Sequence, residues 1–291
     1  MRILILGASG LVGGNCLKYF NEIPGVEAVG TYFSFEAPGT HYYDTLNPEN
    51  PENFDVSGFK PTHILHAGAL THVDYCEEHP EESYRQTVES TKNAVKLANK
   101  FGASIIYIST DYVFDGKNGP YDENADINPL SIYAKHKWEA EEYIRNHTEY
   151  NLILRITNVY GDEIRNKNFV SRLMNVAAKK ENLELKLPTD QYATPINAHD
   201  VAKAIYLLLK DNKTGVYHLA STDYLNRVQL AQKVLSYYPG HNVKIEAIET
   251  KALNQPAPRP LQGGLKAHKF LEEYPFFSFG SVDNYMASRK A

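Results

Sequence analysis

The stretch RILILGASGLVGG, residues 2–14, combines a short apolar run with three glycines at three-residue spacing. Gly7, Gly10 and Gly13 stand where a strand would turn into a helix. Glycines at this place allow a tight turn and a close approach of the backbone to a pyrophosphate, and free N–H groups at a helix start bind phosphates. A second strand about 20 residues later favours a dinucleotide-binding turn. A glycine-rich turn without a ligand is the alternative.

Short apolar runs alternate with helix-length amphipathic segments through the first half of the chain. Because the runs are nearly continuous in apolar residues rather than alternating, each strand is expected to be buried on both faces, as in a parallel sheet covered by helices. The pattern predicts an α/β fold with a Rossmann-type, doubly wound parallel sheet. The predicted strands lie within residues 2–6, 26–32, 63–69, 104–110 and 152–160.

The alternation of apolar runs with amphipathic segments ends after about residue 160. We therefore predict an NAD(P)-binding domain over residues 1–160 and a smaller α/β substrate lobe over residues 161–291, with residues 197–211 returning to the first domain. The predicted elements of the second half are helices near 168–180, 199–210 and 226–237 and the strands LELKL and VYHLA.

Composition excludes several classes of protein. The chain has 291 residues, 43% of them hydrophobic, and a net charge of -5 without a long basic run, so nucleic acid is not an expected partner. No apolar run approaches a membrane span, and the N-terminus lacks a signal-peptide cleavage site. Only two cysteines are present. A cytoplasmic protein without disulfides is expected.

The end of the second predicted strand, GTYFSFE, bears on coenzyme choice. It has no acid at its tip for a ribose 2′-OH and no nearby arginine for a 2′-phosphate; Glu36 lies past the strand end. The hydroxyls of Thr31 and Ser34 are compatible with NADP, and the choice between NADP and NAD stays open. Asp44 follows a short third strand, where an adenine contact and a turn residue are equal alternatives.

An acid–base set is predicted at the fifth strand and the next helix. SIIYIST ends in Ser109-Thr110-Asp111, and Tyr133 and Lys137 follow at i and i+4, on one helix face. Reduction of a ketone by hydride needs a proton donor, and an ammonium about 4 Å away could lower the pKa of a tyrosine by up to about three units. A solvated helix face is the alternative. Lys135 and the acidic run at residues 139–143 are expected to be exposed.

Several motifs together resemble the extended short-chain dehydrogenase/reductase superfamily, and within it most closely the dTDP-4-dehydrorhamnose reductase family. They cover residues 3 to about 265 in order. The motifs are GASGLVG, HAGALTHVDYCE, ISTDYVFDGKNGPYDE with the following Tyr133/Lys137 pair, RITNVYG and PAPRP. The resemblance implies reduction, with NADPH or NADH, of the 4-keto group of a nucleotide-activated 6-deoxy sugar.

The resemblance also implies residue roles. The implied catalytic residues are Thr110, Tyr133 and Lys137, of which the last two also contact the cofactor. The implied cofactor contacts are Gly7, Ser9, Gly10, Leu11, Val12, Gly13, Thr31, Asp44, Ala67, Gly68 and Ala69. The implied substrate contacts are Asp111, Tyr112, Glu123, Asn158 and Arg259.

Departures from the family pattern leave alternatives open. Asn158 stands where rhamnose-forming reductases carry tryptophan and is similar to epimerases and dehydratases. Gly14 and Asn15 replace the acid of magnesium-linked dimers, so no metal is predicted, although a homodimer is compatible with the sequence. His72, Cys76 and His79 lack a fourth metal ligand. A regulatory subunit similar to the β subunit of methionine adenosyltransferase, or a nucleotide-sugar epimerase, remains an alternative function.

Overall fold

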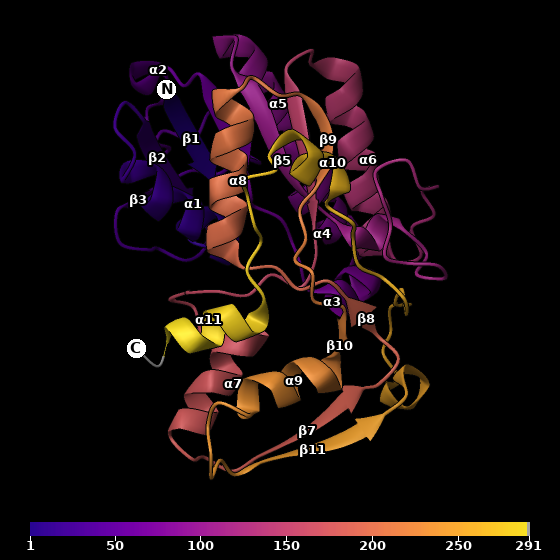
Figure 1. The fold of residues 1–291 in the computed structure, drawn as a ribbon. Helices are drawn as coiled ribbons and strands as arrows, with labels where there is room; N and C mark the ends of the chain where they lie inside the picture. Colours follow the sequence, from indigo (N-terminus) through magenta and orange to yellow (C-terminus); the bar gives the residue numbers. More distant parts are fainter. Residues whose placement is uncertain (290–291) are drawn as a thin grey trace.

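A seven-stranded parallel sheet forms the centre of the molecule, with strand order β3-β2-β1-β4-β5-β6-β9 (Figure 1). The computed structural model describes residues 1–289. The order runs outward from β1 to β3 and resumes on the other side at β4, which places the topological switch point, where open α/β sheets bind ligands, at the carboxyl ends of β1 and β4. The predicted doubly wound parallel fold is confirmed. The strands are β1 (Arg2–Leu6), β2 (Glu27–Tyr32), β3 (Thr40–Tyr42), β4 (His63–His66), β5 (Ser104–Thr110), β6 (Asn151–Ile156) and β9 (Gly215–His218).

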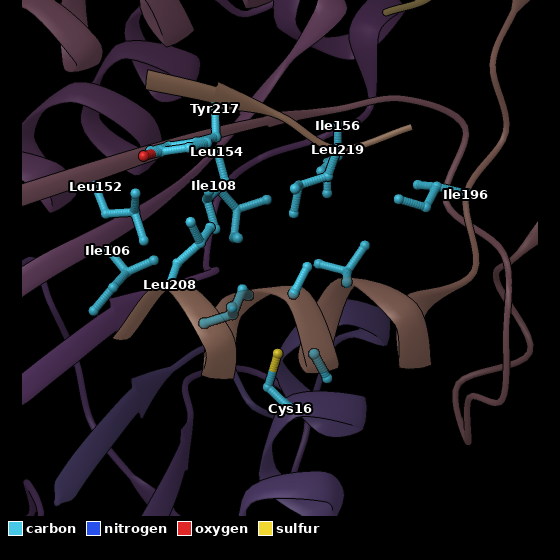
Figure 2. Close-up of a cluster of buried hydrophobic side chains, with 14 of the residues drawn as sticks. Cys16, Ile106, Ile108, Leu152, Leu154, Ile156, Ile196, Leu208, Tyr217 and Leu219 are labelled. Atoms are coloured by element: carbon cyan, nitrogen blue, oxygen red, sulfur yellow. The ribbon is translucent and has the colours of Figure 1, made fainter. Parts of the chain in front are cut away.

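Helices bury both faces of this sheet. Helices α1 (Leu11–Asn21) and α8 (Ala198–Lys210) pack against each other on one face, where Cys16 and Leu208 join Ile106 and Ile108 in one apolar cluster (Figure 2). Helices α5 (Ser90–Phe101) and α6 (Ile132–His147) cover the opposite face. Because successive residues of a strand point to opposite faces, Tyr107 belongs to that second cluster. This double burial explains the continuous apolar runs.

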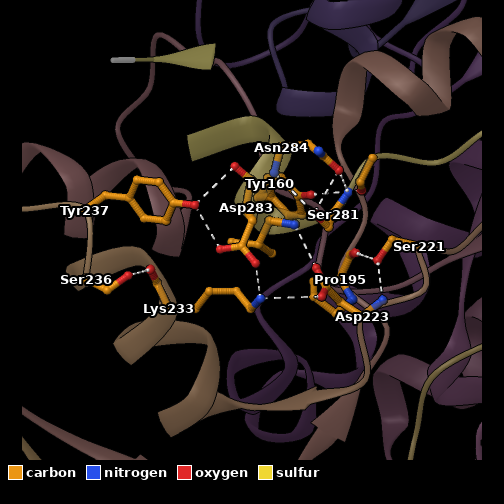
Figure 3. A network of polar contacts seen from close by, with 12 residues as sticks. Tyr160, Pro195, Ser221, Asp223, Lys233, Ser236, Tyr237, Ser281, Asp283 and Asn284 are labelled. Atoms are coloured by element: carbon orange, nitrogen blue, oxygen red, sulfur yellow. Dashed lines mark hydrogen bonds and ion pairs between the residues drawn. The ribbon is translucent and has the colours of Figure 1, made fainter. Parts of the chain in front are cut away.

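A smaller α/β region follows β6. Its two-stranded parallel sheet pairs β7 (Leu183–Pro188) with β11 (Val243–Ile248), and α7 (Phe169–Ala178) and α9 (Arg227–Leu235) pack together beside it. The C-terminal helix α11 (Val282–Ser288) is fixed to α9 by polar contacts around Asp283, which pairs with Lys233 and accepts a hydrogen bond from Tyr237 at 3.0 Å (Figure 3).

The remaining elements are short. Strand β9, predicted from VYHLA, lies at the edge of the large sheet beside β6, although the division at residue 160 would assign it to the smaller lobe. The exact division of the chain stays a prediction. Within residues 1–289, no helix combines the length and apolarity that crossing a membrane requires. The short elements are α2 (Val56–Phe59), α3 (Val73–Glu78), α4 (Pro80–Tyr84), the π-helix η1 (Arg85–Glu89), the 3-10 helices η2 (Asp111–Val113) and η3 (Thr250–Leu253), β8 (Tyr192–Ala193), β10 (Leu225–Asn226) and α10 (His268–Glu273).

Candidate active site

The glycine turn between β1 and α1 contains glycines of two kinds. A Cβ at Gly7, whose φ is +87°, would lie 2.7 Å from the backbone nitrogen of Gly68, and a Cβ at Gly13 would lie 2.5 Å from the Gly7 carbonyl oxygen. Packing therefore requires both. A Cβ at Gly10 would meet nothing closer than 3.4 Å, and one at Gly68 nothing closer than 3.8 Å. At these two residues a Cβ would therefore make only ordinary contacts, so packing does not by itself require glycine there.

The start of α1 suits an anion. Its N-cap is Gly10, which supplies no side-chain hydrogen bond, and the first turn contains no acid. The N–H groups and the positive end of the helix dipole are thus left for a negatively charged group. Ser9, Leu11 and Val12 are half-buried in the same turn, and Ala67–Ala69 follow the neighbouring strand β4. These residues fit the pyrophosphate of a dinucleotide.

Two expected cofactor contacts have other partners. The buried hydroxyl of Thr31 donates to the Ile5 carbonyl at 3.2 Å, so it lies inside the sheet and not at the strand tip. Asp44 Oδ1 accepts from the Leu46 N–H at 2.8 Å, as a turn residue does. Ser34 is exposed at the strand tip. The cofactor roles of Thr31 and Asp44 stay predictions.

Thr110, Tyr133 and Lys137 are all buried near the carboxyl end of β5. The Thr110 hydroxyl caps η2 by accepting from the Tyr112 N–H at 3.2 Å. Helix α6 begins after Ser131, whose hydroxyl accepts from the Ala134 N–H at 3.3 Å, and this cap places Tyr133 in the first turn. Lys137 follows one turn later. The structure thus brings the strand-end hydroxyl and the helical pair together.

Burial shifts the pKa values of this pair in opposite directions. It raises the pKa of Tyr133 well above its ordinary value, and a hydrogen bond from Thr110 partly opposes that shift. Burial lowers the pKa of Lys137 to about 7, while the negative charge of Glu141 opposes it. The Lys137 ammonium donates to the Ile108 carbonyl at 2.6 Å and lies 4.2 Å from the Tyr107 ring centroid. The expected net lowering of the Tyr133 pKa is therefore wrong for this arrangement.

The acidic run of α6 contains a buried carboxylate. Lys135 is exposed as predicted, but Glu141 is 0% exposed, so the expectation of an exposed acidic run is wrong there. Glu141 accepts from the Ser109 hydroxyl at 2.5 Å and from Arg155 at 3.1 Å (Nε) and 2.8 Å (Nη2). Arg145 adds a contact at 2.8 Å. Glu141 lies four residues after Lys137, on the face of α6 that packs against the sheet.

Two predicted substrate residues hold backbone groups instead. Asp111 Oδ2 accepts from the Gly264 N–H at 3.0 Å, and Glu123 Oε1 accepts from the His218 N–H at 2.7 Å. Burial raises the pKa of both carboxyls. Both residues therefore join segments that are distant in sequence. Their contact with a substrate stays a prediction.

Two adjoining hollows lie between the large sheet and the smaller region. The larger cavity, about 210 Å³, is lined by residues that include Asn158, Lys167, Phe169 and Arg227. The second hollow shares Asn158 and Arg227 and adds Asp111 and Tyr112. Asn158 has a φ of +41°, a conformation that asparagine tolerates better than bulky residues. The Tyr112 ring meets the Tyr133 ring edge-on, with centroids 5.9 Å apart, which connects the second hollow to the acid–base pair.

One arginine, Arg227, lines both hollows, and another, Arg259, is adjacent in sequence to a residue that lines the second one. Arg227 was missed by sequence reasoning: its capping signal, N-x-x-Q at Asn226, indicates a helix start but not which site that helix approaches. Arg259 is 7% exposed and pairs with Asp74 at 2.7 Å, while its Nη1 is buried without a hydrogen-bond partner within residues 1–289. Its neighbour Pro260 lines the second hollow. No cluster that could hold a metal occurs among the described residues, and the His72 ring instead caps α3.

Comparison with known proteins places the chain in a family. The model of the RmlD substrate binding domain matches residues 1–278. The chain is 29% identical to dTDP-4-dehydrorhamnose reductase of Escherichia coli over 94% of its own length and 92% of that protein. A solved structure of a dTDP-4-dehydrorhamnose reductase from Clostridium acetobutylicum is 28% identical, with a TM-score of 0.85 over the whole of both chains.

A relative of another function matches less of the chain. The β subunit of methionine adenosyltransferase 2 from Bos taurus is 31% identical over 79% of this chain and 70% of that protein. The predicted likeness to the reductases is confirmed by the family match together with the near-complete coverage of both reductases. The chain belongs to the RmlD substrate binding domain family.

Proposed function

We propose that this protein reduces the 4-keto group of a nucleotide-activated 6-deoxy sugar with NADPH or NADH. The observation that carries the proposal is the burial of Thr110, Tyr133 and Lys137 together at the carboxyl end of β5, the sheet edge that also holds the glycine turn. Ligands bind at that edge in open α/β sheets. The named reductases that match nearly the whole chain support the same reaction.

The glycine turn and the β4 end would hold the coenzyme. The pyrophosphate would lie beside Gly10 and Gly68, two glycines that packing does not require, against the first turn of α1. The bound nicotinamide coenzyme supplies the hydride. We assign coenzyme binding to the part of the chain around the large sheet, and sugar binding to its border with the smaller region, where the two hollows lie.

Tyr133 would act as the proton donor. Its raised pKa keeps the phenol protonated at neutral pH, so the O–H can hydrogen-bond a substrate carbonyl oxygen and pass its proton to that oxygen as negative charge develops. The Thr110 hydroxyl would orient the same oxygen. The Lys137 Nζ, with a pKa near 7, can hold or release a proton at neutral pH and would also contact the nicotinamide ribose.

The substrate side would use the hollows. Arg227 lies at both of them and can pair with the diphosphate of a nucleotide sugar, since a guanidinium binds phosphate oxygens through two parallel N–H groups. Asn158 and Tyr112 would contact the sugar between Arg227 and Tyr133. Arg259 would contact the nucleotide part of the substrate. A cytoplasmic location and a homodimer remain predictions.

A regulatory subunit is the second candidate, because the β subunit of methionine adenosyltransferase 2 is 31% identical over 79% of the chain. A chain acting only by binding a partner enzyme would not need a proton donor beside a carbonyl site. The complete Thr110, Tyr133 and Lys137 set therefore favours chemistry. Co-purification of a synthetase without turnover of any keto-sugar would favour the regulatory function.

Turnover tests the proposal directly. The purified chain is incubated with dTDP-4-keto-6-deoxyhexoses and NADPH or NADH, while nicotinamide absorbance is followed and the product mass is measured. Oxidation of the coenzyme with a product heavier by two hydrogens supports the reductase. Interconversion of sugars without net coenzyme use identifies an epimerase. Absence of coenzyme oxidation with every keto-sugar refutes the proposal.

A further inference from the structure

The tip of β2 lacks the usual recognition group for an unphosphorylated ribose. After β2 ends at Tyr32 come Phe33, Ser34 and Phe35, and the next acid, Glu36, is exposed beyond them. A carboxylate at the strand end hydrogen-bonds the 2′-OH of NAD and repels the 2′-phosphate of NADP. Its absence removes that repulsion but provides no positive partner, and no arginine follows nearby in the sequence.

A distant loop supplies such a partner. Arg165 lies in the segment between β6 and α7, and its guanidinium carbon is 5.1 Å from the centroid of the Phe35 ring. In Figure 1 this segment extends from the sheet toward the side that holds β2 and β3. The contact joins residues 130 positions apart in the sequence. It puts a cation at the strand tip, where sequence spacing indicated none.

The charge of Arg165 is not neutralised by neighbouring acids. Its Nε is buried without a hydrogen-bond partner, and no ion pair joins its guanidinium to a carboxylate within residues 1–289. The two acids of the same loop are engaged elsewhere: Asp162 pairs with Arg289, and Glu163 accepts from the Asn168 N–H. Arg165 therefore has donors available for a ligand.

The cation–π contact between Arg165 and Phe35 suits recognition of a phosphate. An aromatic face attracts a guanidinium placed over it, which favours one position of the side chain, and the planar fork of N–H groups matches two phosphate oxygens. Phe33 and Phe35 are 45% and 36% exposed, so the tip also offers apolar surface beside that fork. Ser34, exposed between them, adds a hydroxyl.

We propose that Arg165 binds the 2′-phosphate of NADP(H) and makes the chain prefer NADPH to NADH. The inference rests on the proposed function, because it concerns the coenzyme of that reaction. The inference deepens the proposed function by naming NADPH as the coenzyme and by assigning the choice between NADPH and NADH to a loop outside the dinucleotide-binding segment. Phe35 acts as a positioning residue for the guanidinium.

Binding measured by calorimetry tests the proposal without turnover. The wild-type chain should bind NADPH more tightly than NADH, and 2′,5′-ADP more tightly than 5′-ADP. Arg165→Met should weaken NADPH roughly ten- to hundredfold, the value of a lost charge-assisted hydrogen bond, and change NADH less than about twofold. Arg165→Lys should recover part of the loss. The matched control is Arg172→Met, because Arg172 is exposed on α7, and it should leave both affinities unchanged.

Three results would overturn the proposal. They are an equal loss of NADPH and NADH affinity in Arg165→Met, no loss of NADPH affinity, or a wild-type preference for NADH. All three leave the reductase proposal standing, since either coenzyme can supply its hydride. Failure of the wild-type chain to bind either coenzyme would instead refute the proposed reductase function. The comparison of 2′,5′-ADP with 5′-ADP uses the wild-type chain alone, so equal binding of the two still refutes the proposal if Arg165→Met does not fold.

Discussion

Replacement of Glu141 by glutamine tests the buried ionic network behind the acid–base pair. The Glu141 carboxylate is 0% exposed and accepts hydrogen bonds from Ser109, from Arg145 and from two nitrogens of Arg155. Arg155 is itself 2% exposed. Removal of one partner of a buried ion pair leaves an uncompensated charge and costs about 3–5 kcal/mol. Glu141→Gln should lower the free energy of unfolding by that amount.

The chain offers a matched control one residue away. Glu142 is 45% exposed and also pairs with Arg145, so Glu142→Gln should cost about 1 kcal/mol or less. Guanidinium unfolding followed by circular dichroism gives both values. The double variant Glu141→Gln/Arg155→Met should recover part of the loss, because it removes both charges of the pair.

Loss of Glu141 should also act on Lys137. Its negative charge raises the pKa of Lys137 against the effect of burial, so Glu141→Gln should lower that pKa below about 7. Any limb of the pH–rate profile that depends on charged Lys137 should move to lower pH. Equal stability losses for Glu141→Gln and Glu142→Gln would refute the buried network, whatever the effect on rate.

Two further predictions concern the glycine turn and Lys137. Gly13→Ala should destabilise the fold, because its Cβ would lie 2.5 Å from a carbonyl oxygen, whereas Gly10→Ala should fold normally and weaken coenzyme binding. Thermal melts compare the stabilities of the two variants, and calorimetry compares their coenzyme affinities. Equal losses of melting temperature would contradict the difference in packing between the two glycines. The folded pKa of Lys137 is about 7, below its ordinary value of 10.5. The unfolded chain therefore binds more protons between these pH values, and wild-type stability should rise with pH there. In Lys137→Met the free energy of unfolding should no longer show this increase, which is up to about 1.4 kcal/mol per pH unit in the wild type. Unfolding measured at several pH values gives both slopes. An identical pH dependence in the two proteins would show that Lys137 does not titrate in this range.

Local sequence signals predicted much of the fold. Apolar runs buried on both faces mark the strands, and the glycine turn at residues 7–13 follows from the backbone approach that it must allow. The spacing of Tyr133 and Lys137 also predicts that the two side chains lie together, because i and i+4 positions share a helix face. These features depend on neighbours within a few residues or on periodicity, which a sequence displays directly.

The remaining features depend on long-range pairing. Glu141 looks like any surface acid until Arg155, on the next strand, supplies a buried counter-charge. Arg165 reaches the tip of β2 only through the return of the β6–α7 loop, and Arg227 reaches the hollows only through the placement of α9. Glu123 is bound to the His218 N–H, a pairing that depends on β9 joining the large sheet. No local pattern encodes such partners.

The most direct test of the central claim compares wild type with Tyr133→Phe in NADPH oxidation by a dTDP-4-keto-6-deoxyhexose, with coenzyme affinity measured for both. We expect substrate-dependent oxidation by the wild type, equal coenzyme affinity, and a rate in the variant lower by about 10²–10⁴-fold, the usual contribution of a positioned proton donor. Equal rates in the two proteins would contradict the assignment of Tyr133 as the proton donor.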